Sequence, residues 1–275
     1  MKKGFLTLGI VASLSLGLAL AGMTACNIET FTYDNAGKYS VGEASMTSAV
    51  TEIEVDWISG NVNVVYGDVE NVAFAETATE TLSEDTTVHY WLEKTTLHIK
   101  YAKSGIALTN KEYPDKDLTV TLPNALSLNK IEIETVEADV TLTEISAVEV
   151  ELDSVAGNIV CGLQTVSELS VDTISGDIEI VGKAVADFDV ETVSGNVQMT
   201  CETAPKRGSF DSVSGDFTLK LPAETGFSVE LENANGSFES EFETTKNGNK
   251  YVCGNGENAY EIEIGTGKVR IVKAV

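Results

Sequence analysis

Histidine and cysteine are scarce in this chain, and each scarcity argues against a class of functional site. Two His residues in 275 leave few options for histidine-based catalysis, and the four Cys residues form no Cys-x-x-Cys pair of the kind that binds zinc. The motifs of serine hydrolases, zinc proteases and nucleotide-binding loops are absent as well. We therefore expect no enzyme, no catalytic residue and no dedicated cofactor.

Basic residues and aromatic residues are also few. Lys and Arg total 18 against 43 Asp and Glu, which gives a net charge of −25. Such a chain repels phosphate groups, so nucleic acid is excluded as a partner and cations or basic surfaces are favoured. Many exported proteins are acidic only for solubility, so charge alone identifies no partner. Aromatics make up 7% of the chain while Val, Ile and Thr are plentiful, which favours strands.

The first 26 residues have the features of an export signal. Lys2 and Lys3 precede the apolar run "GFLTLGIVASLSLGLALAG", and "MTAC" follows it. This ending resembles a bacterial lipoprotein signal, in which the chain is cut before Cys26 and that Cys is lipidated. An ordinary signal peptide that ends near a Cys is the alternative. We expect a signal peptide at 1–25, a lipid-anchored segment at 26–50 and an exported body at 51–275 that the lipid holds to the cell membrane.

A nine-residue phrase recurs through the body. It reads "DSVAGNIVC", "DTISGDIEI", "ETVSGNVQM" and "DSVSGDFTL", and its glycine returns every 19 to 21 residues. Apolar and polar residues alternate on both sides of that glycine, which predicts two short strands joined by a bend. In "FDVETVSGNVQM" the alternation predicts one common face for Phe188, Val190, Val193, Val197 and Met199. We expect structural corners at Gly60, Gly157, Gly176, Gly195, Gly215, Gly236 and Gly267.

A unit of 19–21 residues cannot bury its own apolar side, so it has to stack on its neighbours. The sequence therefore predicts an all-β, single-domain parallel β-helix or β-solenoid. A two-sheet sandwich is the alternative, but a constant period is unusual for a fold with variable loops. Residues 86–101, "TTVHYWLEKTTLHIKY", read as a hairpin, so the N-terminal sheet is expected to be more irregular.

The recurring "TVSGD/N" units, "DLTVTLP" at 117–123 and the ending "YVCGNGENAYEIEIGTGKVRIV" together resemble a known bacterial family. They are similar to the "putative adhesin" β-helix proteins, the LiaG-like group of uncharacterised function, over roughly residues 50–275. The resemblance implies a parallel β-helix and a place in the cell envelope, and it implies little about activity. The chain departs from the pattern at Ala138, where the corner glycine is missing, and at Cys253.

An acid stands four residues before each corner. Alternation predicts that these acids form one outward stripe, in which neighbouring charges repel. Bridging cations such as weakly bound Ca²⁺, a basic partner, or simple screening by mobile ions would each offset that repulsion. The candidate ladder for cations or a partner is Glu134, Asp153, Asp172, Glu191, Asp211 and Glu232, and two outlying units add Asp56 and Glu263.

Four further patterns have mainly structural interpretations. The Asn/Asp residue after each corner and the Thr/Ser column are expected to form ladders of hydrogen bonds. His89 and His98, on opposite arms of the hairpin, are expected to be strand surface rather than a metal pair. Cys161 is expected to be a core residue between Leu142 and Ile180. Three Cys residues remain after Cys26, so at most one disulfide can form.

These observations favour a non-catalytic binding, adhesion or scaffold module at the cell envelope, with an acidic stripe for cations or a basic partner. The expected partners are the membrane, through the lipid, and an envelope protein or surface polymer. Two alternatives stay open: an accessory component of envelope-stress signalling and a polysaccharide-cleaving β-helix enzyme. The second would need one special carboxylate pair, whereas the acids here are periodic.

Overall fold

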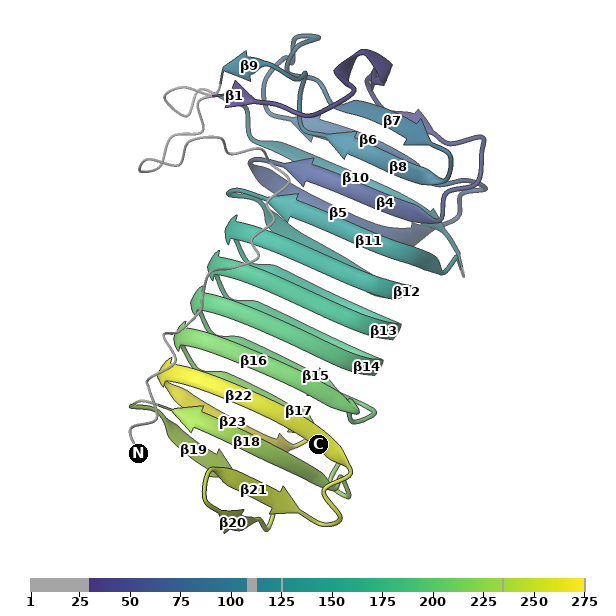
Figure 1. The fold of residues 1–275 in the computed structure, drawn as a ribbon. Helices are drawn as coiled ribbons and strands as arrows, with labels where there is room; N and C mark the ends of the chain where they lie inside the picture. Colours follow the sequence, from purple (N-terminus) through teal and green to yellow (C-terminus); the bar gives the residue numbers. More distant parts are fainter. Residues whose placement is uncertain (1–29, 108–112, 125, 234, 275) are drawn as a thin grey trace.

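The protein is an elongated stack of β-strands. The structure, a computed structural model, describes residues 30–107, 113–124, 126–233 and 235–274. Cys26 and the predicted signal peptide lie outside these residues, so the lipid anchor stays a prediction. Figure 1 shows the strands arranged as successive rungs, with one short 3-10 helix, η1 (Ala36–Lys38), near one end. In the described part, no helix has the length and apolarity needed to cross a membrane.

Three long strands form the middle of the rod, and each makes most of one coil: β12 (Asp139–Ala156), β13 (Ile159–Ser175) and β14 (Ile178–Ser194). They pair in parallel, with Val140 beside Ile159 and Ile159 beside Ile178. The constant spacing of the phrase sets this register, because every coil offers its neighbour the same sequence of apolar and polar positions. The predicted solenoid is confirmed.

Each coil contributes to two faces of the rod. The first half of β12 pairs with β5 (Gly60–Gly67), and its second half pairs with β11 (Leu128–Thr135). On the second face, β11 also pairs with β4 (Glu52–Trp57), which leads into β5 through the Ser59–Gly60 corner. The apolar residues of both faces point inward and form one continuous core along the axis.

At the C-terminal end the order of coils in space departs from their order in the sequence. The coil β16 (Arg207–Ser214) and β17 (Phe217–Leu221) follows β14 and β15 (Val197–Cys201). The final coil, β22 (Asn258–Thr266) and β23 (Lys268–Lys273), then inserts before the coil β18 (Phe227–Asn233) and β19 (Ser237–Ser240). The last coil in the sequence is therefore the last but one in space.

The N-terminal end carries the irregular sheet. The predicted hairpin is confirmed, with β7 (His89–Glu93) antiparallel to β8 (Thr96–Lys100) and Lys94 at the turn with φ 57°. β8 pairs in parallel with β4, and β10 (Lys116–Pro123) lies between β5 and the antiparallel β6 (Ala73–Ala78). The remaining strands are β1 (Thr30–Phe31), β2 (Ser40–Val41), β3 (Ala44–Ser45), β9 (Ile106–Ala107), β20 (Thr245–Asn247) and β21 (Lys250–Cys253).

Short antiparallel strands cover both ends of the parallel stack. β7 covers β8 at one end, and β21 covers β18 at the other, followed by the exposed, three-residue β20. Uncovered strand edges invite pairing with other chains, so these caps stop the solenoid from growing by end-to-end addition.

One inward position differs from its prediction. Val193 lies on the outer side, next to Glu191, while Thr192 takes the buried inward place and is 2% exposed. The strand keeps its strict alternation through Val190, Thr192 and Ser194 up to the corner, so the bend begins one residue later than the valine suggested. Cys161 does lie between Leu142 and Ile180 in the register, as predicted.

Candidate functional site

The acids that precede the corners form one continuous column along the rod. Parallel pairing places Asp56 beside Glu134, Asp153 beside Asp172, and Glu191 beside Asp211. We name this set the acidic column, and its order in space is Asp56, Glu134, Asp153, Asp172, Glu191, Asp211, Glu263 and Glu232. The sequence placed Glu232 directly after Asp211, which is wrong, because the inserted strand β22 brings Glu263 between them.

The acidic column is less exposed than an outward stripe would be. Asp56, Glu134 and Asp153 are buried, the next four acids are half-buried, and Glu232 is exposed. Two residues after each of the four acids Asp153, Asp172, Glu191 and Asp211 stands a partly buried aliphatic side chain, as at Ile174 after Asp172. This aliphatic row runs parallel to the four acids and removes water from one side of each carboxylate.

The raised pKa values of the acids reflect this burial and the stacking. Burial, together with the charges of neighbouring acids, raises the pKa of Asp153 and of Asp172 to about 7. The same two causes raise the pKa of Asp211 to about 6 and raise the pKa of Glu191. Near neutral pH the middle of the column therefore holds carboxyl groups that titrate, and adding or removing a positive charge there changes their protonation.

Basic side chains neutralise the N-terminal end of the acidic surface. We use this name for the acidic column together with the acids that stand two residues before its members, which are Glu54, Glu132, Glu151, Asp189, Glu261 and Glu230. Lys100, opposite Asp56 in the register, has its Nζ 2.6 Å from Asp56 Oδ2 and 2.8 Å from Glu54 Oε1. Lys130 Nζ lies 2.8 Å from Glu132, 3.0 Å from Glu149 and 2.5 Å from Glu151.

Further along, Arg207 pairs with Asp187, outside the acidic column. Among the described residues, no ion pair reaches the central acids Asp172, Glu191 and Asp211. The charge of the column is therefore uncompensated in its middle.

The acids do not gather into a chelating site. In the described part of the chain, no group of three or more His, Cys, Asp or Glu side chains is close enough to hold one metal ion. His89 and His98 do not face each other, since His89 pairs with Lys100 and His98 with Trp91. His98 Nδ1 instead contacts Glu54 at 2.9 Å, and His89 Nδ1 lies 2.9 Å from the Thr87 carbonyl oxygen.

The corners beside the column are built for close stacking. Gly157 and Gly176 have φ of +124° and +126°, and a Cβ on Gly176 would overlap the carbonyl oxygen of Gly157. Positive φ also occurs at Gly60, Gly195, Gly215 and Gly267. Gly236 directly precedes β19, whose Ser237 pairs with Lys268, so it stands beside Gly267. Ala138 occupies the same place in its coil, and its carbonyl oxygen faces Gly157.

The Asn/Asp residues after the corners form the hydrogen-bonded ladder that the sequence suggested. Asn158 N donates to Asp139 Oδ1 at 2.6 Å, Asp177 N to Asn158 Oδ1 at 3.1 Å, and Asn196 N to Asp177 Oδ1 at 2.9 Å. These oxygens are occupied by backbone amides of the next coil, so this column is structural. In the Thr/Ser column the bonds are fewer: Thr135 donates to Ser154, while Thr192 Oγ1 and Ser212 Oγ have no partner.

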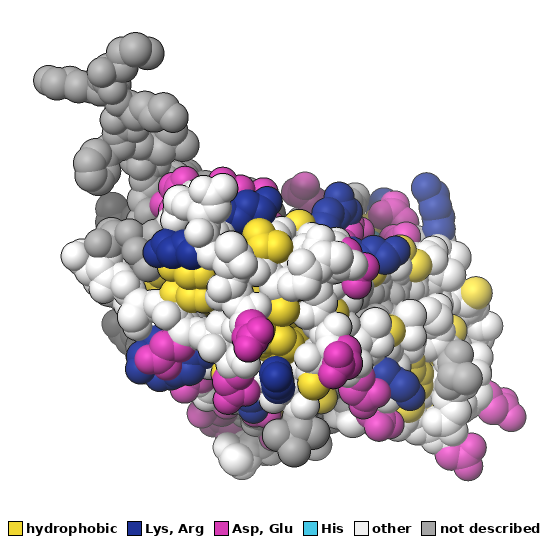
Figure 2. All heavy atoms as spheres, turned by 90° about the horizontal axis from the view of Figure 1, so that it is seen from below, with side chains coloured by type: hydrophobic (Ala, Val, Ile, Leu, Met, Phe, Trp, Pro, Cys, Tyr) yellow, Lys and Arg dark blue, Asp and Glu magenta, His cyan; other side chains and the backbone are white. Residues whose placement is uncertain are grey.

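Sequence reasoning missed Lys100 and Lys130 as members of the acidic surface. Lys130 had a visible signal, because it stands two residues before Glu132 in the same alternating run. Lys100 had none, because only the pairing of β8 with β4 brings it to the column. At the C-terminal end of the rod, Figure 2 shows Lys and Arg side chains among the acids. Lys268 and Arg270, for example, lie 3.5 Å and 3.6 Å from Glu239.

Three solved structures are similar to this chain at low sequence identity. A "putative cell adhesion protein" from Clostridium sporogenes ATCC 15579 is 15% identical, with 86% of this chain and 99% of that chain covered and a TM-score of 0.40. A "putative adhesin" from Bacteroides fragilis NCTC 9343 is 16% identical, with 85% and 97% covered and a TM-score of 0.48. A "putative lipid binding protein" from Parabacteroides distasonis ATCC 8503 is 15% identical, with 87% and 98% covered and a TM-score of 0.43.

Among curated proteins, none matches the chain. The sequence matches one family, Toastrack DUF4097, over residues 46–272. This range includes every coil of the solenoid and every member of the acidic column. The chain therefore belongs to the Toastrack DUF4097 family.

Proposed function

We propose that this protein is a non-catalytic binding module on the outer side of a cell membrane, held there by a lipid on Cys26. Its acidic column binds an extended basic partner. One observation carries the proposal: the carboxylates are stacked on successive rungs, and Asp172, Glu191 and Asp211 in the middle have no cation among the described residues.

Stacked charges of one sign store repulsion that a partner can relieve. Rungs are about 4.8 Å apart, so neighbouring carboxylates repel by roughly 0.8 kcal/mol even at the dielectric constant of water. Lys100 offsets this at Asp56, and Lys130 pairs with Glu132 and Glu151, which stand two residues before Glu134 and Asp153. A basic partner along the middle of the column would offset it there, and the periodic spacing suits a chain with regularly spaced positive side chains.

Divalent cations are the second candidate, because any positive charge lowers the same repulsion. No three described ligands converge on one point, so such ions would bridge neighbouring rungs with modest affinity. Catalysis has less support, because a general acid should stand apart from its neighbours, whereas Asp153 and Asp172 share one environment and the same raised pKa of about 7.

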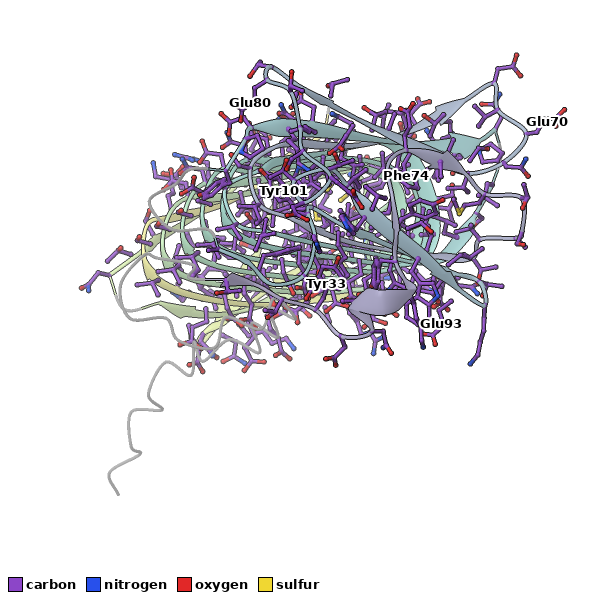
Figure 3. All side chains as sticks on the ribbon, turned by 90° about the horizontal axis from the view of Figure 1, so that it is seen from above. Tyr33, Glu70, Phe74, Glu80, Glu93 and Tyr101 are labelled. Atoms are coloured by element: carbon purple, nitrogen blue, oxygen red, sulfur yellow. The ribbon has the colours of Figure 1, made fainter. Side chains whose placement is uncertain are left out.

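The test is a titration of the purified full-length protein with a ten-residue lysine peptide at about 0.15 M salt. One variant removes four charges from the middle of the acidic surface: Asp172→Asn, Asp189→Asn, Glu191→Gln and Asp211→Asn. A matched variant removes four exposed charges from the N-terminal loops: Asp68→Asn, Glu70→Gln, Glu80→Gln and Glu84→Gln. Figure 3 shows Glu70 and Glu80 on the side of the molecule opposite Tyr33 and Glu93.

We expect the column variant to bind the peptide at least about tenfold more weakly, and the loop variant to change affinity by less than about threefold. Millimolar Ca²⁺ or Mg²⁺ competes with the peptide only if ions occupy the column. Equal losses in the two variants would mean that binding follows net charge alone, and the proposal would fail.

A further inference from the structure

A second candidate site lies at the N-terminal end of the rod, in a cleft of about 350 Å³ between residues 32–39 and the strands β4, β7 and β8. Its volume is within the range of pockets that hold small ligands. In Figure 3 this region lies on the side of the molecule where Tyr33 and Glu93 are labelled. The central acids of the column, Asp172 to Asp211, take no part in it.

The floor of the cleft is a buried network of charges. Lys100 and Asp56 side chains are 5% and 6% exposed, and Glu54 accepts from both Lys100 and His98. Burial alone would raise the pKa of Glu54, but the hydrogen bond from His98 and the Lys100 ammonium lower it to about 2. An ammonium has three N–H donors, and among the described residues Lys100 has partners for two of them, on Glu54 and Asp56.

Two other buried polar atoms at the cleft make no hydrogen bond of good geometry among the described residues. They are the Tyr33 hydroxyl, which lies near the Ser104 backbone N–H but outside hydrogen-bond geometry, and His98 Nε2, whose nearest acid is Glu93 at 3.9 Å. His98 Nδ1 faces a Glu54 carboxylate and so donates, which leaves Nε2 as an acceptor in the neutral ring. Buried polar groups without hydrogen-bond partners are rare and costly. We therefore expect an occupant of the cleft that forms hydrogen bonds with these two atoms.

The walls are aromatic. Trp91 stacks on His98 with ring centroids 5.3 Å apart, Tyr39 lies 5.8 Å from Trp91, and Tyr33 lies 4.6 Å from Tyr39. The Lys38 ammonium also lies over the Trp91 ring, with its Nζ 4.3 Å from the ring centroid. Linked rings of this kind give a fixed apolar surface beside polar groups, the combination that orients a small ligand.

Charge selects the class of ligand. An anion would meet four acids on the cleft: Asp34, Glu54, Asp56 and Glu93. A cation would be repelled by Lys100, which already pairs with the carboxylates of Glu54 and Asp56. A neutral molecule rich in hydroxyl groups avoids both costs, because each hydroxyl both donates and accepts and so can serve Lys100, Tyr33 and His98 together.

We propose that this cleft binds a neutral sugar unit, with the aromatic walls against the ring and Lys100, Tyr33 and His98 bonded to its hydroxyls. The site is separate from the central acidic column and does not depend on a basic partner. The protein would then contact a neutral surface polysaccharide through its N-terminal end.

The two tryptophans make a direct test possible. Trp91 lines the cleft, whereas Trp57 is fully buried in the core and serves as an internal reference. The full-length protein, labelled with 5-fluorotryptophan and held in a detergent without a sugar headgroup, is titrated by ¹⁹F NMR. The neutral probes are glucose, galactose, mannose and N-acetylglucosamine, and glucuronate and glucosamine present a related ring with a negative and a positive charge.

The Trp91 signal is expected to shift with saturation at millimolar concentrations of at least one neutral sugar, while the Trp57 signal stays in place. Three results overturn the proposal. They are no Trp91 shift with any neutral sugar up to about 50 mM, equal shifts of both tryptophans, or tighter binding of glucuronate or glucosamine than of every neutral sugar. The first leaves a cleft that holds only water.

A pair of variants separates binding from folding. Tyr33→Phe removes a hydroxyl that makes no hydrogen bond of good geometry with the described residues, so the variant should unfold within about a degree of the unaltered protein. Its affinity for the sugar should nevertheless fall by about three- to tenfold. Tyr90 packs on Phe74 outside the cleft, so Tyr90→Phe should leave the affinity for the sugar unchanged. Unchanged affinity in Tyr33→Phe would exclude the proposed site.

Discussion

Lys100 lies directly opposite Asp56 in the parallel pairing of β8 with β4, and its Nζ is 2.6 Å from Asp56 Oδ2. Both side chains are nearly inaccessible to solvent. Burial opposes the charge of Lys100, but Asp56 and Glu54 outweigh it and raise the lysine pKa. The acids in the middle of the acidic column repel one another, whereas Asp56 at its N-terminal end is paired with the positive charge of Lys100.

Removing that charge should destabilise the N-terminal end strongly. Lys100→Met leaves the buried Asp56 without its cation, and breaking a buried pair in this way costs about 3–5 kcal/mol. The free energy of unfolding, measured in urea, should fall by that amount. Lys103→Met is the control, because the Lys103–Asp85 pair is more than half exposed and solvent-exposed pairs contribute little to stability. Similar losses in the two variants would show that the Lys100 pair is not special.

Stability should fall as pH rises through the neutral range. Asp153 and Asp172 have folded pKa values of about 7, above their ordinary value of 3.8, so the folded protein binds protons more tightly than the unfolded chain. Their contribution to stability is complete below pH 4 and is lost between about pH 4 and pH 7. The melting temperature should therefore be lower at pH 8 than at pH 5, by a few degrees.

Asp172→Asn tests whether the acidic column causes this fall in stability with rising pH. The amide cannot ionise, so the variant should lose less stability between pH 5 and pH 8, and it should melt above the unaltered protein at pH 8. Asp68→Asn, an exposed acid outside the column, should keep the original slope. If both variants keep it, the pH dependence arises from net charge and not from the column.

The middle of the fold could be predicted because it is repetitive. Equal spacing from Asp153 to Asp172 and on to Glu191 gives each coil the same neighbour, and only one parallel register then keeps every apolar residue inside. The hairpin from His89 to Lys100 was equally visible, since two alternating runs flank a short polar turn. Local pattern decides structure where the contacts between coils repeat.

The ends could not be predicted, because their contacts join segments that no periodicity relates. Nothing in the alternation distinguishes Glu263 from Glu232 as the neighbour of Asp211, and the outcome depends on where β22 inserts. The place of Lys100 likewise follows from the pairing of β8 with β4 alone. The cleft combines residues from the segment 32–39 with three strands, and the sequence gives no sign that they meet.

The corner glycines should be intolerant of even a methyl group. Gly176 has φ +126°, and an added Cβ would overlap the carbonyl oxygen of Gly157 in the preceding coil. Gly176→Ala should therefore lower the free energy of unfolding by at least about 2 kcal/mol, as strain adds to the loss of close stacking. Gly37 has open space around the position of an added Cβ, so Gly37→Ala should change the free energy of unfolding by less than about 1 kcal/mol. A mild effect at Gly176 would mean that the coils can shift apart at their corners.

The thiols offer a test of both the fold and the anchor. Cys161 and Cys201 are buried, and burial raises the pKa of each to about 12, so neither should react with iodoacetamide in the folded protein. Cys253 is partly exposed and unpaired, so it should be the single reactive thiol in the described part of the chain. Mass spectrometry of the folded protein should find one label, at Cys253.

Unfolding the labelled protein in urea under non-reducing conditions extends the same experiment to Cys26. All three thiols of the body should then react, because none forms a disulfide in the structure. Cys26 should remain unlabelled if it carries a lipid, since a thioether sulfur reacts with iodoacetamide far more slowly than a thiolate does. A fourth label on Cys26 would contradict the lipid anchor while leaving the solenoid intact. Protection of Cys161 even in urea would instead indicate a disulfide and would contradict the structure, in which Cys161 is a free, buried thiol.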